Sequence, residues 1–254
     1  MVETIFQAGA SHIGSNLSCA DIISVLFGTI LKFDASQPEW PDRDRFILSK
    51  GHAAVVMYSV LAEMGYIPGD ALTQYSKNGS TLLGHISHHV PGVELSTGSL
   101  GHGLPVGIGM ALAAKADKKP HRTYILLSDG EMDEGSNWEA ILFAGFHKLS
   151  NLIAIIDYNK IQSYGSVKDV LDLEPLAQKL SNFNWQTYEV DGHDITGLRQ
   201  TFSQLSTKDS KPTAVICHTV KGKGISFMEN NLAWHYQNPT GDQYAAAILE
   251  LSAK

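Results

Sequence analysis

The chain has 254 residues, of which 43% are hydrophobic and 18% are charged, and its formal net charge is −7 at pH 7. This composition is typical of a globular protein with one sizeable core, or at most two, and the negative charge argues against nucleic-acid binding. No apolar run approaches the length of a membrane span, and residues 1–10 show no secretory signal. The two cysteines do not suggest a disulfide framework, so we expect a cytoplasmic protein without a membrane partner.

The first segment of interest is a polar, glycine-flanked loop at residues 7–14, which contains His12. Ser18 is a candidate N-cap for the helix that follows, because apolar side chains then recur on one helical face up to Phe27. A single loop histidine is most often a surface residue. By itself, His12 therefore does not indicate a site.

Residues 42–53 predict a strand, a glycine turn and the start of a helix. His52 follows Gly51 at that helix start, where free backbone N–H groups and the helix dipole favour an anionic oxygen. The alternative is a histidine with only a capping role.

Residues 84–94 hold three histidines within five positions, His85, His88 and His89. Such a group could bind Zn²⁺, but neither Cys nor a carboxylate lies nearby at a helical ligand spacing. Residues 96–105 are rich in glycine and precede a predicted helix at 106–116. The Gly101-x-Gly103 pattern is weak evidence for a dinucleotide fold, because no clear hydrophobic strand precedes it.

The centre of the chain predicts two parallel strands joined by a helix. Residues 124–127 form a short apolar run that ends at a polar turn, residues 138–149 have helical spacing, and residues 151–157 form a second apolar run. A right-handed crossover would make the two strands parallel neighbours. Asp129 and Asn159 would then lie together at the edge where α/β sheets bind ligands.

These two residues suggest a metal site. Asp129 offers a carboxylate, Asn159 an amide oxygen, and the backbone carbonyl of Ile161 could supply a third oxygen. Mg²⁺ is usually held by a few such ligands together with phosphates and water. Gly130 would let the backbone approach a phosphate closely. For either polar residue alone, an ordinary strand-end turn is the better interpretation, but the pair at this spacing favours a site.

The remaining segments continue the alternation of predicted helices and strands. A helix is predicted at residues 173–180, a strand at 185–190, a helix at 194–205 with Asp194 as N-cap, and a strand at 212–220. Lys221 and Lys223 follow on a glycine loop, which suggests anion binding, although exposed flexible lysines are the default. We therefore expect one domain over residues 1–254, with a doubly wound, mostly parallel α/β sheet covered by helices on both faces.

Several of these segments resemble the transketolase family. Asp129-Gly130, Glu134-Gly135, Glu139-Ala140 and Asn159 are similar to the thiamine diphosphate signature, although Ser128 stands where its first glycine is usual. Further similarity lies in residues 42–53, in Gly84-His85 before Pro-Gly-Val-Glu, in the Thr-Gly-Ser-Leu-Gly segment at 97–101, and in the 220–235 segment ending Trp-His. The first loop is also similar, but Ser11 and Ile13 replace a glycine and a proline of the family, and His102 replaces a glutamine.

The resemblance implies roles for individual residues. His52, Gly98, Leu100, Gly130 and His235 would contact thiamine diphosphate. Asp129, Asn159 and the Ile161 carbonyl would hold Mg²⁺, or another divalent cation such as Ca²⁺ or Mn²⁺. The candidate catalytic residues are His12, His52 and His85, because imidazole titrates near neutral pH. Glu134 and Glu139 would be structural or would meet a partner subunit.

The resemblance covers only the diphosphate-binding part of a transketolase. We therefore expect the N-terminal subunit of a split transketolase, which passes a two-carbon ketol unit from a ketose or ketose phosphate to an aldose or aldose phosphate. A C-terminal subunit would supply the pyrimidine-binding domain, in an α2β2 heterotetramer. The alternatives are the α subunit of a 2-oxoacid dehydrogenase, against which the histidine loops argue, and a non-catalytic cofactor-binding subunit.

Overall fold

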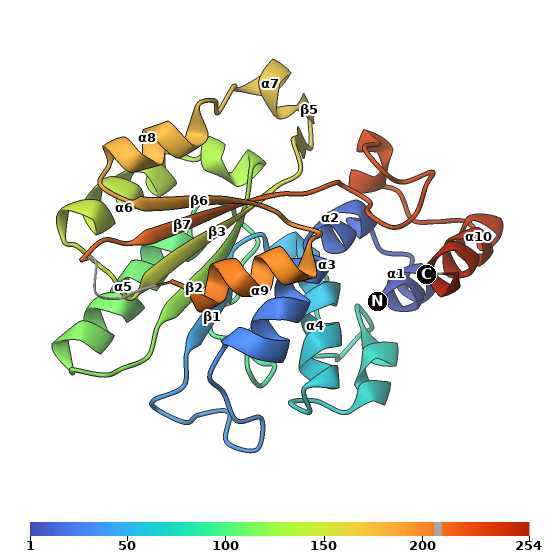
Figure 1. Cartoon of the computed structure of the whole chain (residues 1–254). Coiled ribbons are helices and arrows are strands. Elements are labelled where there is room, and N and C mark those ends of the chain that lie inside the picture. Colours follow the sequence, from blue (N-terminus) through green and yellow to red (C-terminus); the bar gives the residue numbers. More distant parts are fainter. Residues whose placement is uncertain (206–209, 254) are drawn as a thin grey trace.

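The computed structural model describes residues 1–205 and 210–253. Its centre is a five-stranded sheet with the order β1 (Arg45–Leu48), β2 (Thr123–Ser128), β3 (Leu152–Tyr158), β7 (Thr213–His218) and β6 (Gln186–Asp191) (Figure 1). All four neighbouring pairs are parallel. The expected parallel pairing of β2 with β3 is confirmed, and Ser128 lies opposite Asp157 at their carboxyl ends.

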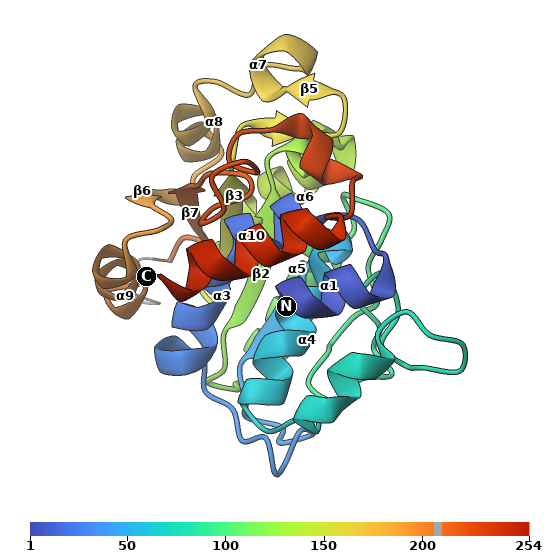
Figure 2. The same ribbon diagram turned by 90° about the vertical axis from the view of Figure 1, so that its right-hand side faces the viewer.

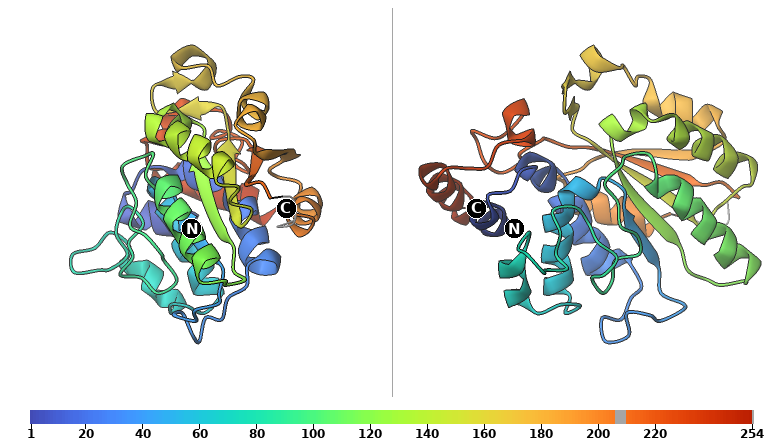
Figure 3. Two further views of the ribbon diagram at one scale, coloured as in Figure 1. Left: turned by 90° about the vertical axis from the view of Figure 1, so that its left-hand side faces the viewer. Right: turned by 180° about the vertical axis from the view of Figure 1, so that it is seen from behind.

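Helices cover both faces of the sheet, because alternate strand residues point to opposite sides. Tyr124 and Leu126 of β2 belong to one apolar core, whereas Ile125 and Leu127 belong to the other. The first core includes residues of α2 (Ile13–Ser18), α3 (Ala20–Val25), α4 (Ala54–Glu63) and α9 (Ile195–Ser203). The second includes residues of α5 (Gly103–Ala116), α6 (Gly135–Phe146) and α8 (Leu176–Asn182). The view from behind in Figure 3 shows α5 and α6 lying over this face of the sheet. The doubly wound α/β prediction is confirmed.

The two terminal helices lie next to each other. Helices α1 (Val2–Ala8) and α10 (Gly241–Ser252) run side by side near the marked chain ends (Figure 2). The rings of Phe6 and Tyr244 stack with their centroids 4.3 Å apart. The sequence patterns above predicted neither helix.

Short elements complete the chain. They are the π-helix η1 (Leu26–Ile30), the 3-10 helices η2 (Gly51–Ala53), η3 (Gly69–Gln74), η4 (Gly130–Asp133) and η5 (Leu232–His235), the helix α7 (Val167–Val170), and the antiparallel pair β4 (Ile161–Gln162) and β5 (Gly165–Ser166). In the described part of the chain, no helix has the length and apolarity needed to cross a bilayer.

Several boundary predictions were wrong, among them the starts of α5 and α8, which begin at Gly103 and Leu176 rather than at residues 106 and 173. Ser18 does not cap a helix but ends α2, because its buried hydroxyl donates to the Ser15 carbonyl at 3.1 Å and to the Asp157 carboxylate at 2.6 Å. Helix α6 begins at Gly135 rather than Trp138. By contrast, the Asp194 side chain accepts a hydrogen bond from the Thr196 N–H at 3.1 Å, so its predicted N-cap role is confirmed.

Candidate functional site

A pocket opens beyond the carboxyl ends of β1, β2 and β3, and it brings together every residue for which the family resemblance implied a cofactor, metal or catalytic role. These residues are His12, His52, His85, Gly98, Leu100, Asp129, Gly130, Asn159, Ile161 and His235. They come from segments spread over more than 220 positions of sequence. The parallel topology explains their meeting, because it directs all strand ends toward one edge.

The predicted metal ligands stand on two adjoining turns. Asp129 Oδ1 accepts the Gly130 N–H at 2.7 Å and Oδ2 accepts the Lys160 N–H, so the carboxylate is fixed in orientation. Asn159 Oδ1 accepts the Ile161 N–H at 3.2 Å. Burial, and then the nearby Asp157 carboxylate, raise the pKa of Asp129 to about 6. A bound cation would stabilise the negative charge of the buried Asp129 carboxylate, so this set of oxygen ligands fits Mg²⁺.

Gly130 leaves room for a ligand at this turn. A Cβ atom there would lie only 2.8 Å from the Cβ of Gln162, which also lines the pocket. A larger residue would therefore push the two walls apart. The close approach of Gln162 therefore requires a glycine here, whereas the expected approach of a phosphate to Gly130 stays a prediction.

Four imidazoles gather on the other side of the pocket. The ring centroid of His12 lies 5.2 Å from that of His52, 5.9 Å from that of His85 and 5.2 Å from that of His235. Burial is the main cause that lowers the pKa of His12 to about 4 and of His235 to about 3, and it holds that of His52 well below its usual range. These three rings are therefore neutral at pH 7.

His12 keeps its place despite the altered loop around it. Its backbone has a φ of 69°, its N–H donates to the His235 carbonyl at 3.0 Å, and its Nδ1 lies 2.9 Å from Ser11 Oγ. Ile13, which stands at the family's proline position, is fully buried and starts α2. The Ser11 contact and the buried Ile13 thus anchor the loop that places His12 in the pocket wall.

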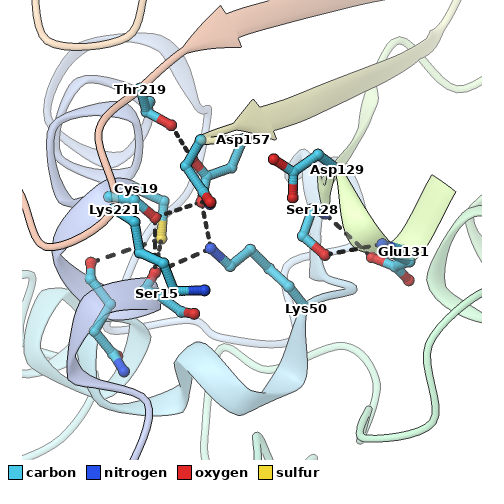
Figure 4. A network of polar contacts seen from close by, with 12 residues as sticks. Ser15, Cys19, Lys50, Ser128, Asp129, Glu131, Asp157, Thr219 and Lys221 are labelled. Carbon is cyan, nitrogen blue, oxygen red and sulfur yellow. Dashed lines mark hydrogen bonds and ion pairs between the residues drawn. The ribbon is translucent and has the colours of Figure 1, made fainter. Parts of the chain in front are cut away.

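A buried ion pair that the sequence patterns did not predict adjoins the pocket, which one of its members, Lys50, lines (Figure 4). Lys50 Nζ contacts the Asp157 carboxylate and donates to the Ser15 carbonyl at 2.9 Å, and both charged side chains are fully buried. Burial alone would lower the pKa of Lys50, but Asp157 outweighs that effect and holds it above its usual value. Asp157 interrupts an otherwise apolar strand, which was the available signal.

Lys221 was also misjudged. Instead of being an exposed lysine, it is 1% exposed, and its Nζ lies 3.0 Å from the Ile161 carbonyl oxygen and 2.8 Å from His235 Nδ1. Burial and the neighbouring Lys50 charge lower its pKa to about 8. Lys221 therefore places a positive charge beside the candidate metal ligands, where an anion would be attracted.

The zinc and dinucleotide-fold interpretations find no support. Across residues 1–205 and 210–253, no three His, Cys, Asp or Glu side chains are arranged to hold a metal, so the zinc interpretation of the 84–94 loop fails. His88 and His89 are exposed and stack on each other at 4.3 Å. Gly101 lies in the loop before α5 and Gly103 is the first residue of that helix, so the two do not form a strand-to-helix phosphate turn.

These features define a class of protein. An α/β domain with a parallel five-stranded sheet carries hard oxygen ligands, neutral imidazoles and two buried lysines at the carboxyl ends of its strands. That combination suits a divalent cation together with a phosphorylated cofactor.

Comparison with known proteins gives the family. The family described as "Transketolase, thiamine diphosphate binding domain" matches residues 1–248, and this chain belongs to it. The chain is 41% identical to a subunit of the apulose-4-phosphate transketolase of Phocaeicola vulgatus, over 100% of this chain and 90% of that protein. It is 39% identical to the 6-deoxy-6-sulfo-D-fructose transketolase subunit SqwG of a Clostridium species, over 98% of this chain and 91% of that protein.

Solved structures agree with the family. The fold is similar to that of a transketolase from Campylobacter jejuni, with a TM-score of 0.93, 30% identity and 99% coverage of this chain. The chain spans only 40% of that structure's chain. The predictions of a transketolase-type N-terminal subunit, of an enzyme of that family and of thiamine diphosphate as cofactor are therefore confirmed.

Proposed function

We propose that this chain forms a Mg²⁺-dependent transketolase together with a second, C-terminal subunit. The observation that carries the proposal is the meeting of Asp129, Asn159 and the Ile161 carbonyl with four imidazoles in one pocket. The similarity to proteins of nearly the same length that are named as transketolase subunits supports the need for a partner. The free and buried state of both cysteines supports a reducing, cytoplasmic location.

In this proposal, the two walls of the pocket hold different parts of the ligand. Asp129, Asn159 and the Ile161 carbonyl would hold the divalent cation, and the backbone of Gly130 would lie close to the diphosphate. His52, His235 and Lys221 surround the same anion, with Lys221 as its positive partner. On the other wall, Gly98 lies against the His85 ring, since a Cβ at Gly98 would be 3.5 Å from His85 Cδ2. Gly98 and Leu100 shape the cofactor's binding surface.

Bound thiamine diphosphate supplies the electron sink that allows a carbon–carbon bond next to a carbonyl to break. The chain's own contribution is to position and to move protons. His12, which is neutral at pH 7, can donate one N–H to a substrate carbonyl oxygen and accept a proton at its other nitrogen. His85 faces it at 5.9 Å across the pocket and is the second candidate for this task.

The size of the pocket supports a shared site. Its volume is about 160 Å³, which is below the roughly 300–1,000 Å³ of sites that enclose a whole cofactor-sized ligand. A second chain would complete it by providing the pyrimidine-binding part. We expect a two-plus-two heterotetramer, with ketose phosphate and aldose phosphate as substrates.

A product assay tests this function. The chain would be incubated with its C-terminal subunit, thiamine diphosphate, Mg²⁺, and a panel of ketose and aldose phosphates, and products would be read by mass spectrometry. Two-carbon extension of an aldose, seen only when both subunits are present and lost in Asp129→Asn, is the expected result. Carbon dioxide release from 2-oxoacids without any ketol transfer would contradict the proposal.

A further inference from the structure

A second buried carboxylate, Glu131, lies two residues beyond Asp129 and has no place in the function described above. Its side chain is 0% exposed and it does not line the pocket. A buried carboxylate is costly unless donors surround it, so its partners show what it does.

The partners of Glu131 come from three separate segments. Its Oε1 accepts the Ser49 hydroxyl, just after β1, and the Gly101 N–H at 2.9 Å, in the loop before α5. Its Oε2 accepts the Ser128 N–H at 3.4 Å, at the end of β2. One carboxylate therefore joins three loops at the pocket edge of the sheet (Figure 4 shows its contact with Ser128).

Ser128 and Glu131 bond to each other in both directions. While Glu131 accepts the Ser128 N–H, the Ser128 hydroxyl accepts the Glu131 N–H at 3.2 Å. This is the reciprocal pattern of a Ser-x-x-Glu capping box, and it encloses Asp129 and Gly130. The serine that departs from the family's glycine thus has a physical role, because it closes the turn that carries the candidate metal ligand.

The loop before α5 is packed tightly against this turn. Ser49 Oγ, which donates to Glu131, also accepts the Gly103 N–H at 3.1 Å. Ser136 Oγ donates to the Gly101 carbonyl at 2.7 Å, and a Cβ on Gly101, whose φ is +80°, would lie 2.6 Å from that hydroxyl oxygen. The loop therefore has little freedom to shift while the Glu131 bonds are intact.

We propose that Glu131 is a positioning residue that holds the Gly98–Gly101 wall of the pocket at a fixed distance from the Asp129–Gly130 wall. Gly98 and Leu100 line one side of the pocket, and Asp129 and Gly130 line the other. Loss of the carboxylate lets the two walls separate, so cofactor and cation bind more weakly although no ligand-contacting residue has changed. This inference rests on the proposed binding of thiamine diphosphate and Mg²⁺.

The test compares Glu131→Gln with the matched control Glu174→Gln in the full chain paired with its C-terminal subunit. Glu174 also accepts one side-chain and one backbone hydrogen bond, from the Tyr158 hydroxyl at 2.7 Å and the Leu176 N–H at 3.0 Å, but it lies outside the pocket. Calorimetry with Mg²⁺ and thiamine diphosphate measures the dissociation constant. Hydrogen exchange of the cofactor-free chain measures protection of the Gly101 amide.

We expect Glu131→Gln to bind the cofactor about tenfold or more weakly and to lose protection at Gly101, and Glu174→Gln to do neither. Turnover of Glu131→Gln should recover at saturating cofactor, because Glu131 does not touch the reacting groups. Faster Gly101 exchange with cofactor affinity within twofold of wild type would overturn the proposal, as would unchanged Gly101 protection.

A second variant covers the case in which Glu131→Gln does not fold. Ser49→Ala keeps the carboxylate but removes its hydroxyl partner, and we expect binding at least about threefold weaker, whereas an unchanged constant would overturn the proposal. If wild type itself binds no thiamine diphosphate, the proposed function fails instead. The Gly101 exchange of the cofactor-free chain then still decides whether the link between the loops exists.

Discussion

Two lysine–aspartate ion pairs lie at opposite ends of the strands of the sheet. Lys119 and Asp42 meet at 2.8 Å near the amino ends of β2 and β1, and each side chain is 39% exposed. Lys50 and Asp157 meet at the carboxyl edge, and each is 0% exposed. The comparison separates the effect of the contact from that of its environment, because only the buried pair adjoins the pocket, which Lys50 lines.

The environment determines what each pair does. The exposed pair is screened by water and contributes about 0–1 kcal/mol. The buried carboxylate of Asp157 also accepts hydrogen bonds from Ser18 and Thr219, so its oxygens are well satisfied. Breaking such a pair leaves an uncompensated charge, while exchanging both partners for apolar residues is often tolerated. The buried pair therefore fixes one arrangement of the strand ends more than it adds stability.

The largest expected effect comes from breaking the buried pair. Lys50→Met leaves Asp157 charged and unpaired, so the free energy of unfolding should fall by about 3–5 kcal/mol. Urea denaturation at pH 7 measures this change. The double variant Lys50→Met, Asp157→Leu should be more stable than the single one. A loss below about 1 kcal/mol in Lys50→Met would show that the pair is not isolated from water.

An intermediate effect concerns pH. His12 and His235 have folded-state pKa values of about 4 and about 3, below the usual 6.5, so between these values the unfolded chain binds more protons. The cofactor-free protein should therefore lose stability as the pH falls from about 6.5 toward 4, by up to about 1.4 kcal/mol per pH unit for each fully linked histidine. Partial exposure of both rings reduces this figure.

Asp129 acts in the opposite direction. Its pKa is raised to about 6, so its contribution to stability is lost as the pH rises through that value. Chemical denaturation between pH 4.5 and 7.5 measures the free energy of unfolding, in which the effects of the two histidines and of Asp129 add up. His12→Gln and His235→Gln should each flatten the fall on the acid side. An unchanged slope in both variants would mean that the two rings bind protons in the folded protein as they do in the unfolded chain.

The smallest effect belongs to the exposed pair. Lys119→Met should change the free energy of unfolding by less than about 1 kcal/mol, and added salt should reduce the difference further. Urea denaturation at low and high ionic strength measures the change in the free energy of unfolding and its dependence on salt. A loss of unfolding free energy as large as that in Lys50→Met would contradict the distinction between the exposed and the buried ion pair.

Sequence patterns predicted the parallel strands and the pocket residues for one physical reason. Strand ends, glycine turns and polar residues that follow apolar runs are local signals, and the parallel topology brings them together without further information. Asp129 and Asn159 are of this kind. The motif resemblance added the histidine loops, whose residues are distant in sequence.

The missed features depend on contacts that local patterns do not carry. Asp157 lies inside an apolar strand, and only the structure shows that Lys50, 107 positions away, meets it. Lys221 follows a strand on a glycine loop and was expected in solvent, but α2 and η5 enclose it. Ser18 was interpreted as a cap because its hydroxyl partner, Asp157, comes from β3.

The most direct test of the central claim is calorimetric titration of thiamine diphosphate with Mg²⁺ into the chain, alone and with its C-terminal subunit. We compare wild type, Asp129→Asn and the distant control Lys119→Met. The account predicts binding that requires Mg²⁺, tightens with the partner, is unchanged in Lys119→Met, and is at least about 100-fold weaker in Asp129→Asn, since changes to residues behind metal ligands already cost about 10–100-fold. Equal binding by wild type and Asp129→Asn, or no binding even with the partner present, would contradict it.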